Sequence, residues 1–157
     1  MLKHYAEAQK LADSLGNGVT AAEVLAVAGN ESGWGDPKSK AQYGNFFGLH
    51  GAGSAGSVPA ARNPSVKIAK FSVSKDNDGF QASGQAFVKL LQDKKVLMPG
   101  IGNNPKAFFD VLNKSGLYAV ESHGTYAAMM VQNDSHKRGP YTFVIECINQ
   151  LKKENRL

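Results

Sequence analysis

The chain has 157 residues, 42% of them apolar and 20% charged, which suits one self-sufficient hydrophobic core and excludes a multidomain machine. Its net charge of +5 favours a polyanionic partner, such as nucleic acid, anionic lipid or an anionic cell wall. The single cysteine, Cys147, excludes an internal disulfide and a cysteine-based metal cluster. Neither a run of about 20 apolar residues nor a signal-peptide layout is present, so we expect no membrane insertion and no N-terminal export signal.

Two helices are predicted in the first 32 residues. Apolar residues recur at helical spacing from Leu2 to Leu15, and Gly16 ends the pattern. The second helix is predicted from Ala21 to about Ser32. Its N-cap is Thr20, because Thr20 and Glu23 have the spacing of a capping box.

The next region is predicted to be mostly irregular. Residues 33–65 follow no sustained period and contain many of the 17 glycines, and loops of this length inside a compact domain are usually functional. The β-branched run from Val66 to Val73 predicts a short strand or hairpin. We therefore expect an irregular or β lobe over about residues 35–75.

Helices are predicted to return in the second half of the chain. An apolar stripe from Phe80 to Leu91 predicts one helix, for which Asp76 and Asp78 offer N-caps. Three more helical patterns follow, from Pro105 after the N-cap Asn104 to Gly116, from Thr125 to about Gln132, and from Tyr141 to about Lys153. The expected fold class is mainly α (α+β), with residues 1–157 as one domain. Cys147 lies on the apolar stripe of the last predicted helix, so we interpret it as an inert core thiol.

Glu31 is the most informative residue of the sequence. It lies in the last turn of the second predicted helix, where the helix dipole disfavours a negative charge. Its neighbours three, four and seven positions back are Ala28, Val27 and Val24, so it projects from the apolar face. A carboxyl group at an apolar edge has its pKa pushed upward, as a general acid requires, whereas a surface glutamate at a fraying helix end is the structural alternative.

Two segments around this glutamate carry a family resemblance. The first reads Asn30-Glu31-Ser32-Gly33-Trp34-Gly35, and the second reads Tyr43-Gly44-Asn45-Phe46-Phe47-Gly48-Leu49-His50-Gly51. In order and spacing they resemble the signature blocks of lysozyme-like glucosaminidases of glycoside hydrolase family 73. The resemblance continues more weakly to the segment from Gly116 to Glu121. It implies a lysozyme-like two-lobed fold with a small β-hairpin or irregular lobe beside the catalytic helix.

The resemblance also implies roles for individual residues. Glu31 becomes the proton donor to the glycosidic oxygen, Tyr118 matches the family's active-site tyrosine, and Glu121 stands where the family has an aspartate. Substrate contacts are expected from Trp34 and Tyr43, whose rings suit sugar faces, and from Ser32, Asn45, Phe46, His50 and Tyr126. For Trp34 core packing is the alternative, and for His50 a structural role. The four histidines lack metal-ligand spacing, so neither metal nor cofactor is expected.

A second carboxylate is usually needed for glycoside hydrolysis, and the sequence leaves its identity open. Glu121, Asp76 and Asp78 are candidates, although all three also suit helix capping. A single-acid mechanism, in which polar groups position water or the substrate's acetamido group attacks, is the other alternative. The leading hypothesis is a hydrolase of the peptidoglycan glycan strand that cleaves β-1,4 bonds between N-acetylglucosamine and N-acetylmuramic acid, acting as a glucosaminidase or muramidase.

Three further readings are open at this stage. A lytic transglycosylase of the same fold would use the same acid, and a non-catalytic wall-binding or assembly module would keep the fold without the chemistry. A nucleic-acid-binding domain ranks last, because the basic residues are scattered and no known motif is present. We expect a bacteriolytic monomer that acts in the periplasm or at the cell wall, as a phage lysin or a toxin effector with a cognate immunity protein.

Overall fold

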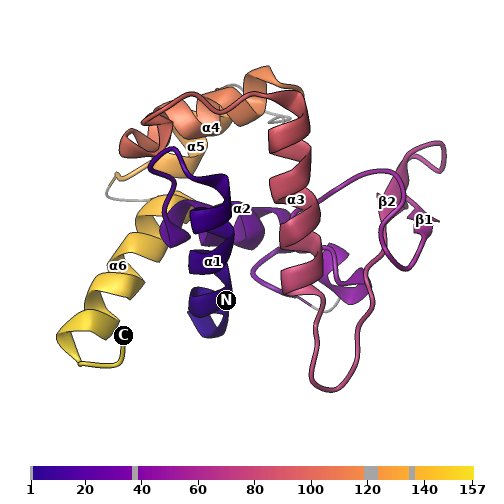
Figure 1. The fold of residues 1–157 in the computed structure, drawn as a ribbon, viewed down its shortest axis with the longest axis horizontal. Coiled ribbons are helices and arrows are strands. Elements are labelled where there is room, and N and C mark those ends of the chain that lie inside the picture. The colour runs from indigo at the N-terminus through magenta and orange to yellow at the C-terminus, as the bar shows by residue number, and fades with distance from the viewer. Residues whose placement is uncertain (1, 37–38, 119–123, 135–136) are drawn as a thin grey trace. The chain divides into compact units, whose positions relative to one another are not determined.

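The computed structural model describes residues 2–36, 39–118, 124–134 and 137–157 (Figure 1). It forms two compact units, one of residues 28–90 and one of residues 2–27 with 91–157. The division falls within helix α2 (Ala21–Ser32) and within helix α3 (Phe80–Lys94). Helices dominate the structure, and one small antiparallel sheet accompanies them, which confirms the predicted mainly α (α+β) class.

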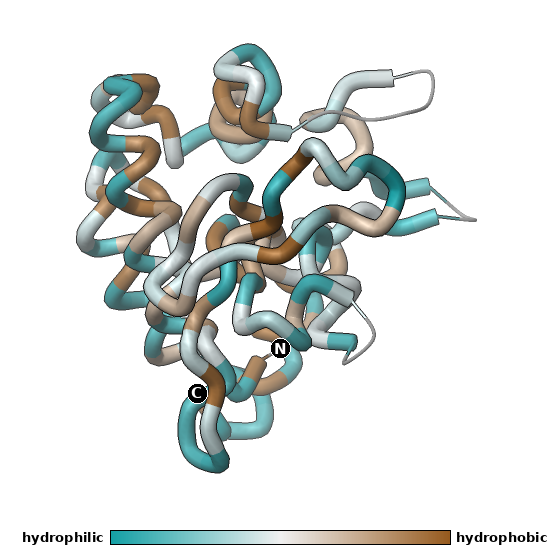
Figure 2. The backbone as a smooth tube through the Cα atoms, turned by 90° about the vertical axis from the view of Figure 1, so that its right-hand side faces the viewer, coloured by the Kyte–Doolittle hydropathy of each residue, from teal (hydrophilic) through white to brown (hydrophobic). Residues whose placement is uncertain are grey.

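The unit of residues 2–27 and 91–157 is helical. After a short 3-10 helix, Leu2–His4, it contains α1 (Tyr5–Leu15), the start of α2 and end of α3, a second 3-10 helix, Ile101–Asn103, α4 (Pro105–Lys114), α5 (Tyr126–Val131) and α6 (Pro140–Lys153). The predicted helices of this unit are confirmed, and Asn104 caps α4 by accepting from the Ala107 N–H at 3.2 Å. Hydrophobic and hydrophilic stretches follow each other along the helical coils, as expected for helices with one apolar face (Figure 2). The core includes Phe108, Phe109 and Met130, while Cys147 is only half-buried.

The sheet belongs to the unit of residues 28–90. Strand β1 (Ser57–Pro59) pairs antiparallel with β2 (Lys67–Ala69), and Val58 lies opposite Ile68. The strand predicted within residues 66–73 is therefore present, but its partner lies upstream, in the region predicted to be irregular. A three-residue strand with one apolar side chain is too short to produce a recognisable alternation in the sequence.

An aromatic cluster forms the core of this unit. Phe47 stacks on Phe87 of α3 with ring centroids 4.9 Å apart, and Phe46 meets Phe80 edge-on at 5.4 Å. Phe80, Phe87 and Leu91 are buried, as the predicted stripe requires. Phe46 and Phe47 of the second signature block are thereby packed against α3. The second signature block thus has a fixed position within the unit.

Glu23 departs from the ordinary behaviour of a capping-box glutamate. Its Oε2 accepts hydrogen bonds from the Thr20 N–H at 2.7 Å and from the Thr20 hydroxyl at 3.0 Å, so the carboxylate half of the predicted capping box is confirmed. The side chain is fully buried, and its Oε1 has no hydrogen-bond partner in the described part of the chain. Burial raises the pKa of Glu23 to about 7, against the opposing effect of the Thr20 bonds. Burial and the Glu23 charge also raise the pKa of Tyr141.

The free energy of unfolding is therefore expected to fall as the pH rises toward the pKa of Glu23. Its pKa in the folded chain, about 7, lies above the ordinary glutamate value of 4.5, so the folded state holds the proton more tightly and loses stability as the pH rises between these two values. Glu23→Gln resembles the protonated side chain, and we expect it to be more stable than wild type at pH 8 by about 3 kcal/mol and equal to it near pH 4. Urea unfolding of both proteins across this range measures the difference. A constant difference between them at every pH would contradict the expectation.

Candidate active site

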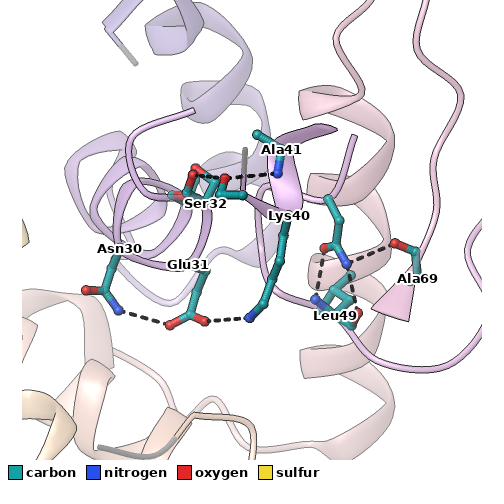
Figure 3. A network of polar contacts seen from close by, with 10 residues as sticks. Asn30, Glu31, Ser32, Lys40, Ala41, Leu49 and Ala69 are labelled. Atoms are coloured by element: carbon teal, nitrogen blue, oxygen red, sulfur yellow. Dashed lines mark hydrogen bonds and ion pairs between the residues drawn. The ribbon is translucent and has the colours of Figure 1, made fainter. Parts of the chain in front are cut away.

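The Glu31 carboxylate lies at the end of α2 between an amide and an ammonium group (Figure 3). Its Oε1 accepts a hydrogen bond from Asn30 Nδ2 at 3.0 Å, and its Oε2 lies 3.6 Å from Lys40 Nζ. The side chain is 14% exposed, so it is largely desolvated without being sealed from solvent. A nearby cation and an amide donor both favour the charged form of a carboxylate. The structure therefore surrounds Glu31 with polar groups, where the sequence predicted an apolar edge.

Lys40 begins the 3-10 helix Lys40–Tyr43 (η2), and the residue before it fixes the start of that helix. Ser39 caps η2 by accepting from the Ala41 N–H at 3.3 Å, and its hydroxyl donates to the Ser32 carbonyl at the end of α2. These bonds join η2 to the residue that follows Glu31. The Lys40 side chain extends from there, with its ammonium facing the Glu31 carboxylate (Figure 3).

Gly48 brings the second signature block against this ion pair. A Cβ atom at Gly48 would lie 2.7 Å from Glu31 Oε2 and 2.9 Å from Lys40 Nζ. The residue also has a φ of +62°, which side chains other than glycine rarely adopt. The two sequence blocks that carry the family resemblance therefore meet at Glu31. A glycine is needed at this position both for the turn and for the space that it leaves to the carboxylate.

Gly48→Ala is expected to displace the carboxylate and to lower any activity that depends on Glu31 by at least about tenfold, because small misplacements of reacting groups are costly. Gly51→Ala is the matched control. It has the same left-handed strain, with a φ of +91°, but a Cβ there meets nothing within 4 Å. Both variants should lose about 1 kcal/mol of stability from backbone strain. Equal activities of the two variants would show that the contact with Glu31 is unimportant.

Asn45 has a different position from the substrate contact predicted for it. Its side chain is fully buried, and Nδ2 donates to the carbonyls of Leu49 at 2.8 Å and Ala69 at 3.0 Å. Its Oδ1 accepts from the Leu49 N–H at 2.9 Å. The amide is thus committed to backbone groups and fastens the 45–49 turn to the end of β2. Because that turn contains Gly48, Asn45 positions the wall of the site without facing a ligand.

Trp34 rests on the last turns of α2. Its backbone N–H donates to the Gly29 carbonyl at 2.7 Å, and a Cβ at Gly29 would lie 2.6 Å from the indole ring. Trp34 has a φ of +60°, an uncommon conformation for a bulky residue and one that marks functional segments in many proteins. The residue is 40% exposed, so Trp34 packs on the helix and also reaches the surface. Both predicted roles, packing and stacking, fit this position.

The remaining predicted substrate contacts of this unit divide by burial. Ser32 and Phe46 are buried, and the Ser32 hydroxyl donates to the Ala28 carbonyl at 2.6 Å while accepting from the Gly35 N–H at 3.1 Å. These two residues support the site from within, which differs from the contact predicted for them. Tyr43 is half-buried and His50 is exposed, so both remain available to a ligand.

Tyr118 and Tyr126 belong to the other unit. Their rings stack with centroids 5.3 Å apart, and their exposed fractions are 6% and 1%. The structure therefore places both predicted site tyrosines in the core of that unit. Glu121, predicted as a catalytic carboxylate, lies outside the described residues.

The other two candidates for a second carboxylate, Asp76 and Asp78, precede α3. Asp78 accepts from the Phe80 N–H, the first of α3, at 3.2 Å, although Gly79 has the N-cap position itself, and Asp76 is exposed. Within residues 2–36, 39–118, 124–134 and 137–157, no group of three or more His, Cys, Asp or Glu side chains is arranged to hold a metal ion. Over the same residues, no helix is long and apolar enough to cross a membrane.

Asn30 and Lys40 both contact Glu31, and neither was predicted as a site residue from the sequence. Asn30 is adjacent to Glu31 in the chain, so its side chain was a foreseeable neighbour. Lys40 comes nine positions later, in a segment with no period, and one lysine there has no distinguishing pattern. Lys40 lies close to the end of α2 because Ser39, the residue before it, is hydrogen-bonded to the Ser32 carbonyl.

Comparison with known proteins gives one structural relative. No family model and no curated protein matches this sequence. A chain of the type VI secretion system effector–immunity complex from Pseudomonas protegens has a similar structure, with a TM-score of 0.67 over 96% of this chain and 89% of that chain. The two sequences are 24% identical. At this identity the likeness establishes a shared fold.

Proposed function

We propose that this protein is a glycosidase that cleaves β-1,4 bonds between amino sugars in the peptidoglycan glycan strand, with Glu31 as the general acid. The observation that carries the proposal is the meeting of the two signature blocks at Glu31. The first block provides the carboxyl group, and the second provides Gly48, whose missing side chain leaves room beside it. A partly exposed carboxyl group in such a position can reach a glycosidic oxygen and donate a proton as the bond to the sugar breaks.

The charge of the surrounding unit agrees with an acidic substrate. Residues 50–75, which contain the hairpin of β1 and β2, include Arg62, Lys67, Lys70 and Lys75 but no aspartate or glutamate. Peptidoglycan strands carry carboxylates on muramic acid and on stem peptides. A cationic segment in the unit that contains Glu31 favours their approach at low salt.

A toxin delivered to other bacteria is the biological setting that we propose. The structural relative belongs to an effector–immunity complex, and a peptidoglycan-cleaving effector needs an inhibitor wherever it can reach the wall of its producer. We therefore propose action in the periplasm or at the cell wall, and an immunity protein as a partner.

Digestion of purified sacculi tests the reaction and separates its variants. After borohydride reduction, mass analysis should show a reduced N-acetylglucosamine end for a glucosaminidase or a reduced N-acetylmuramic acid end for a muramidase. An anhydro-muramic end would identify a lytic transglycosylase that uses the same acid. Binding to sacculi with none of these ends would favour the non-catalytic wall-binding module and refute the proposal.

A further inference from the structure

Lys40 presents an ammonium group with unused hydrogen-bonding capacity next to the proposed acid. Its Nζ lies 3.6 Å from Glu31 Oε2, beyond the 2.7–3.0 Å typical of a charge-assisted hydrogen bond. No other side-chain partner of Lys40 is found in the described part of the chain, and the side chain is 35% exposed. An ammonium carries three donors. Lys40 can therefore bind a second anion or acceptor while it stays beside Glu31.

The same ion pair matters for a general acid. Proton donation to a leaving oxygen requires the carboxylic acid, and a neighbouring cation in general favours the carboxylate form. A substrate carboxylate on Lys40 would compensate the positive charge and add a negative charge next to Glu31. Both changes in general favour the protonated form of a nearby carboxyl group. A neutral sugar chain offers neither change.

The position of Lys40 is fixed from both ends. Ser39 joins the start of η2 to the Ser32 carbonyl, and the Lys40 carbonyl accepts from the Asn45 N–H at 3.2 Å. Its Nζ lies where a Cβ on Gly48 would come within 2.9 Å, so the turn of the second block borders it. Figure 3 shows the side chain extended toward the carboxylate. The backbone of Lys40 therefore has a fixed position next to Glu31, and the turn of the second block borders its ammonium.

We propose that Lys40 binds a carboxylate of the substrate beside the glycosidic oxygen that Glu31 protonates. The enzyme would thereby select amino-sugar strands that carry carboxylates over neutral ones. This inference rests on the proposed glycosidase function of Glu31. The carboxylate has two sources in peptidoglycan, namely the lactyl group of muramic acid and the acidic residues of the stem peptide. Lys40 is then a specificity-determining residue, which acts by direct contact with the substrate.

Three substrates separate the possibilities. They are intact strands with stem peptides, strands stripped by an amidase so that the lactyl carboxylates are free, and stripped strands whose carboxyl groups have been reduced to alcohols. The proteins are wild type, Lys40→Met, Lys40→Arg and the control Lys89→Met, which removes the charge of an exposed lysine that belongs to the same unit but lies outside residues 50–75. For each combination of protein and substrate, we measure kcat/KM for the release of new sugar ends.

Lys40→Met is expected to lose about 10–100-fold in kcat/KM on a carboxylate-bearing strand and less than about twofold on the reduced strand. Lys40→Arg and Lys89→Met should stay within about fivefold of wild type on every strand. A loss on stripped strands identifies the lactyl carboxylate, and a loss on intact strands alone identifies the stem peptide. An equal loss on charged and reduced strands would overturn the proposal, because Lys40 would then act only by positioning Glu31.

Failure of the proposed function gives a different result from failure of this inference. If wild type releases no ends from any strand, Glu31 is not a glycosidase acid. Binding is then measured by the fluorescence of Trp34, the single tryptophan, which lies three positions after Glu31. Weaker binding of stripped strands by Lys40→Met, with unchanged binding of reduced strands, would still support a carboxylate site at Lys40. Equal binding of both strands by Lys40→Met and wild type would overturn that too.

Discussion

Glu31→Gln is expected to lower the rate of glycan-strand cleavage by about 10²–10⁴-fold, the range that positioned general acids contribute. Glutamine preserves the shape of the side chain, and its carbonyl oxygen can still accept the Asn30 hydrogen bond. The variant lacks only the transferable proton and the charge facing Lys40. Release of sugar ends from purified sacculi, followed over a range of substrate concentrations, should show the loss mainly in kcat.

The loss must come from chemistry and not from unfolding. The Glu31–Lys40 pair is partly exposed, and such pairs contribute about 0–1 kcal/mol, so the thermal midpoint should change by no more than about 4 °C. Glu146→Gln, which removes an exposed carboxylate that pairs with Arg138, is the matched control and should keep full activity. A Glu31→Gln protein that clears sacculi within a few-fold of wild type would refute Glu31 as the acid.

Asn45→Ala is expected to be the most destabilising of the substitutions considered, by about 3 kcal/mol or more. It removes the partner of the buried Leu49 N–H and the Asn45 bond to the Ala69 carbonyl, and each buried group left unsatisfied costs about 1–3 kcal/mol. The Leu49 carbonyl loses one bond but still accepts from the Ala69 N–H at 3.0 Å. For a chain of this size the thermal midpoint should fall by about 6–12 °C. Because the turn that Asn45 holds contains Gly48, activity at permissive temperature should fall as well.

Asn45→Asp and Asn63→Ala distinguish this explanation from a general sensitivity to mutation. Aspartate keeps the acceptor for the Leu49 N–H but turns an oxygen toward the carbonyls of Leu49 and Ala69, so it should be no more stable than alanine. The Asn63 side chain accepts from the exposed Ser65 N–H, and its loss should cost less than about 1 kcal/mol. An Asn45→Ala protein as stable as Asn63→Ala would mean that water replaces the amide.

Helix positions and Glu31 itself were predictable from the sequence. Local signals set the helices, since caps such as Asn104 and stripes such as Phe80 to Leu91 depend on residues within a few positions of one another. Glu31 was recognisable because a carboxylate on an apolar face at a helix end conflicts with its local surroundings. The two signature blocks were also visible as ordered motifs, although their meeting point was not.

The contacts and the burial of the polar residues in and around the site depended on tertiary structure. Asn45 is a polar residue in a glycine-rich loop, a pattern equally typical of a ligand contact and of a buried turn, and only the folded chain shows its amide bonded to Leu49 and Ala69. Glu23 has an ordinary capping-box spacing, and its raised pKa follows from burial that no local pattern reports. Lys40 reaches Glu31 through a turn without periodicity. Sequence signals act over short separations, whereas burial and charge pairing are set by segments that folding brings together, and those properties decide what the site can do.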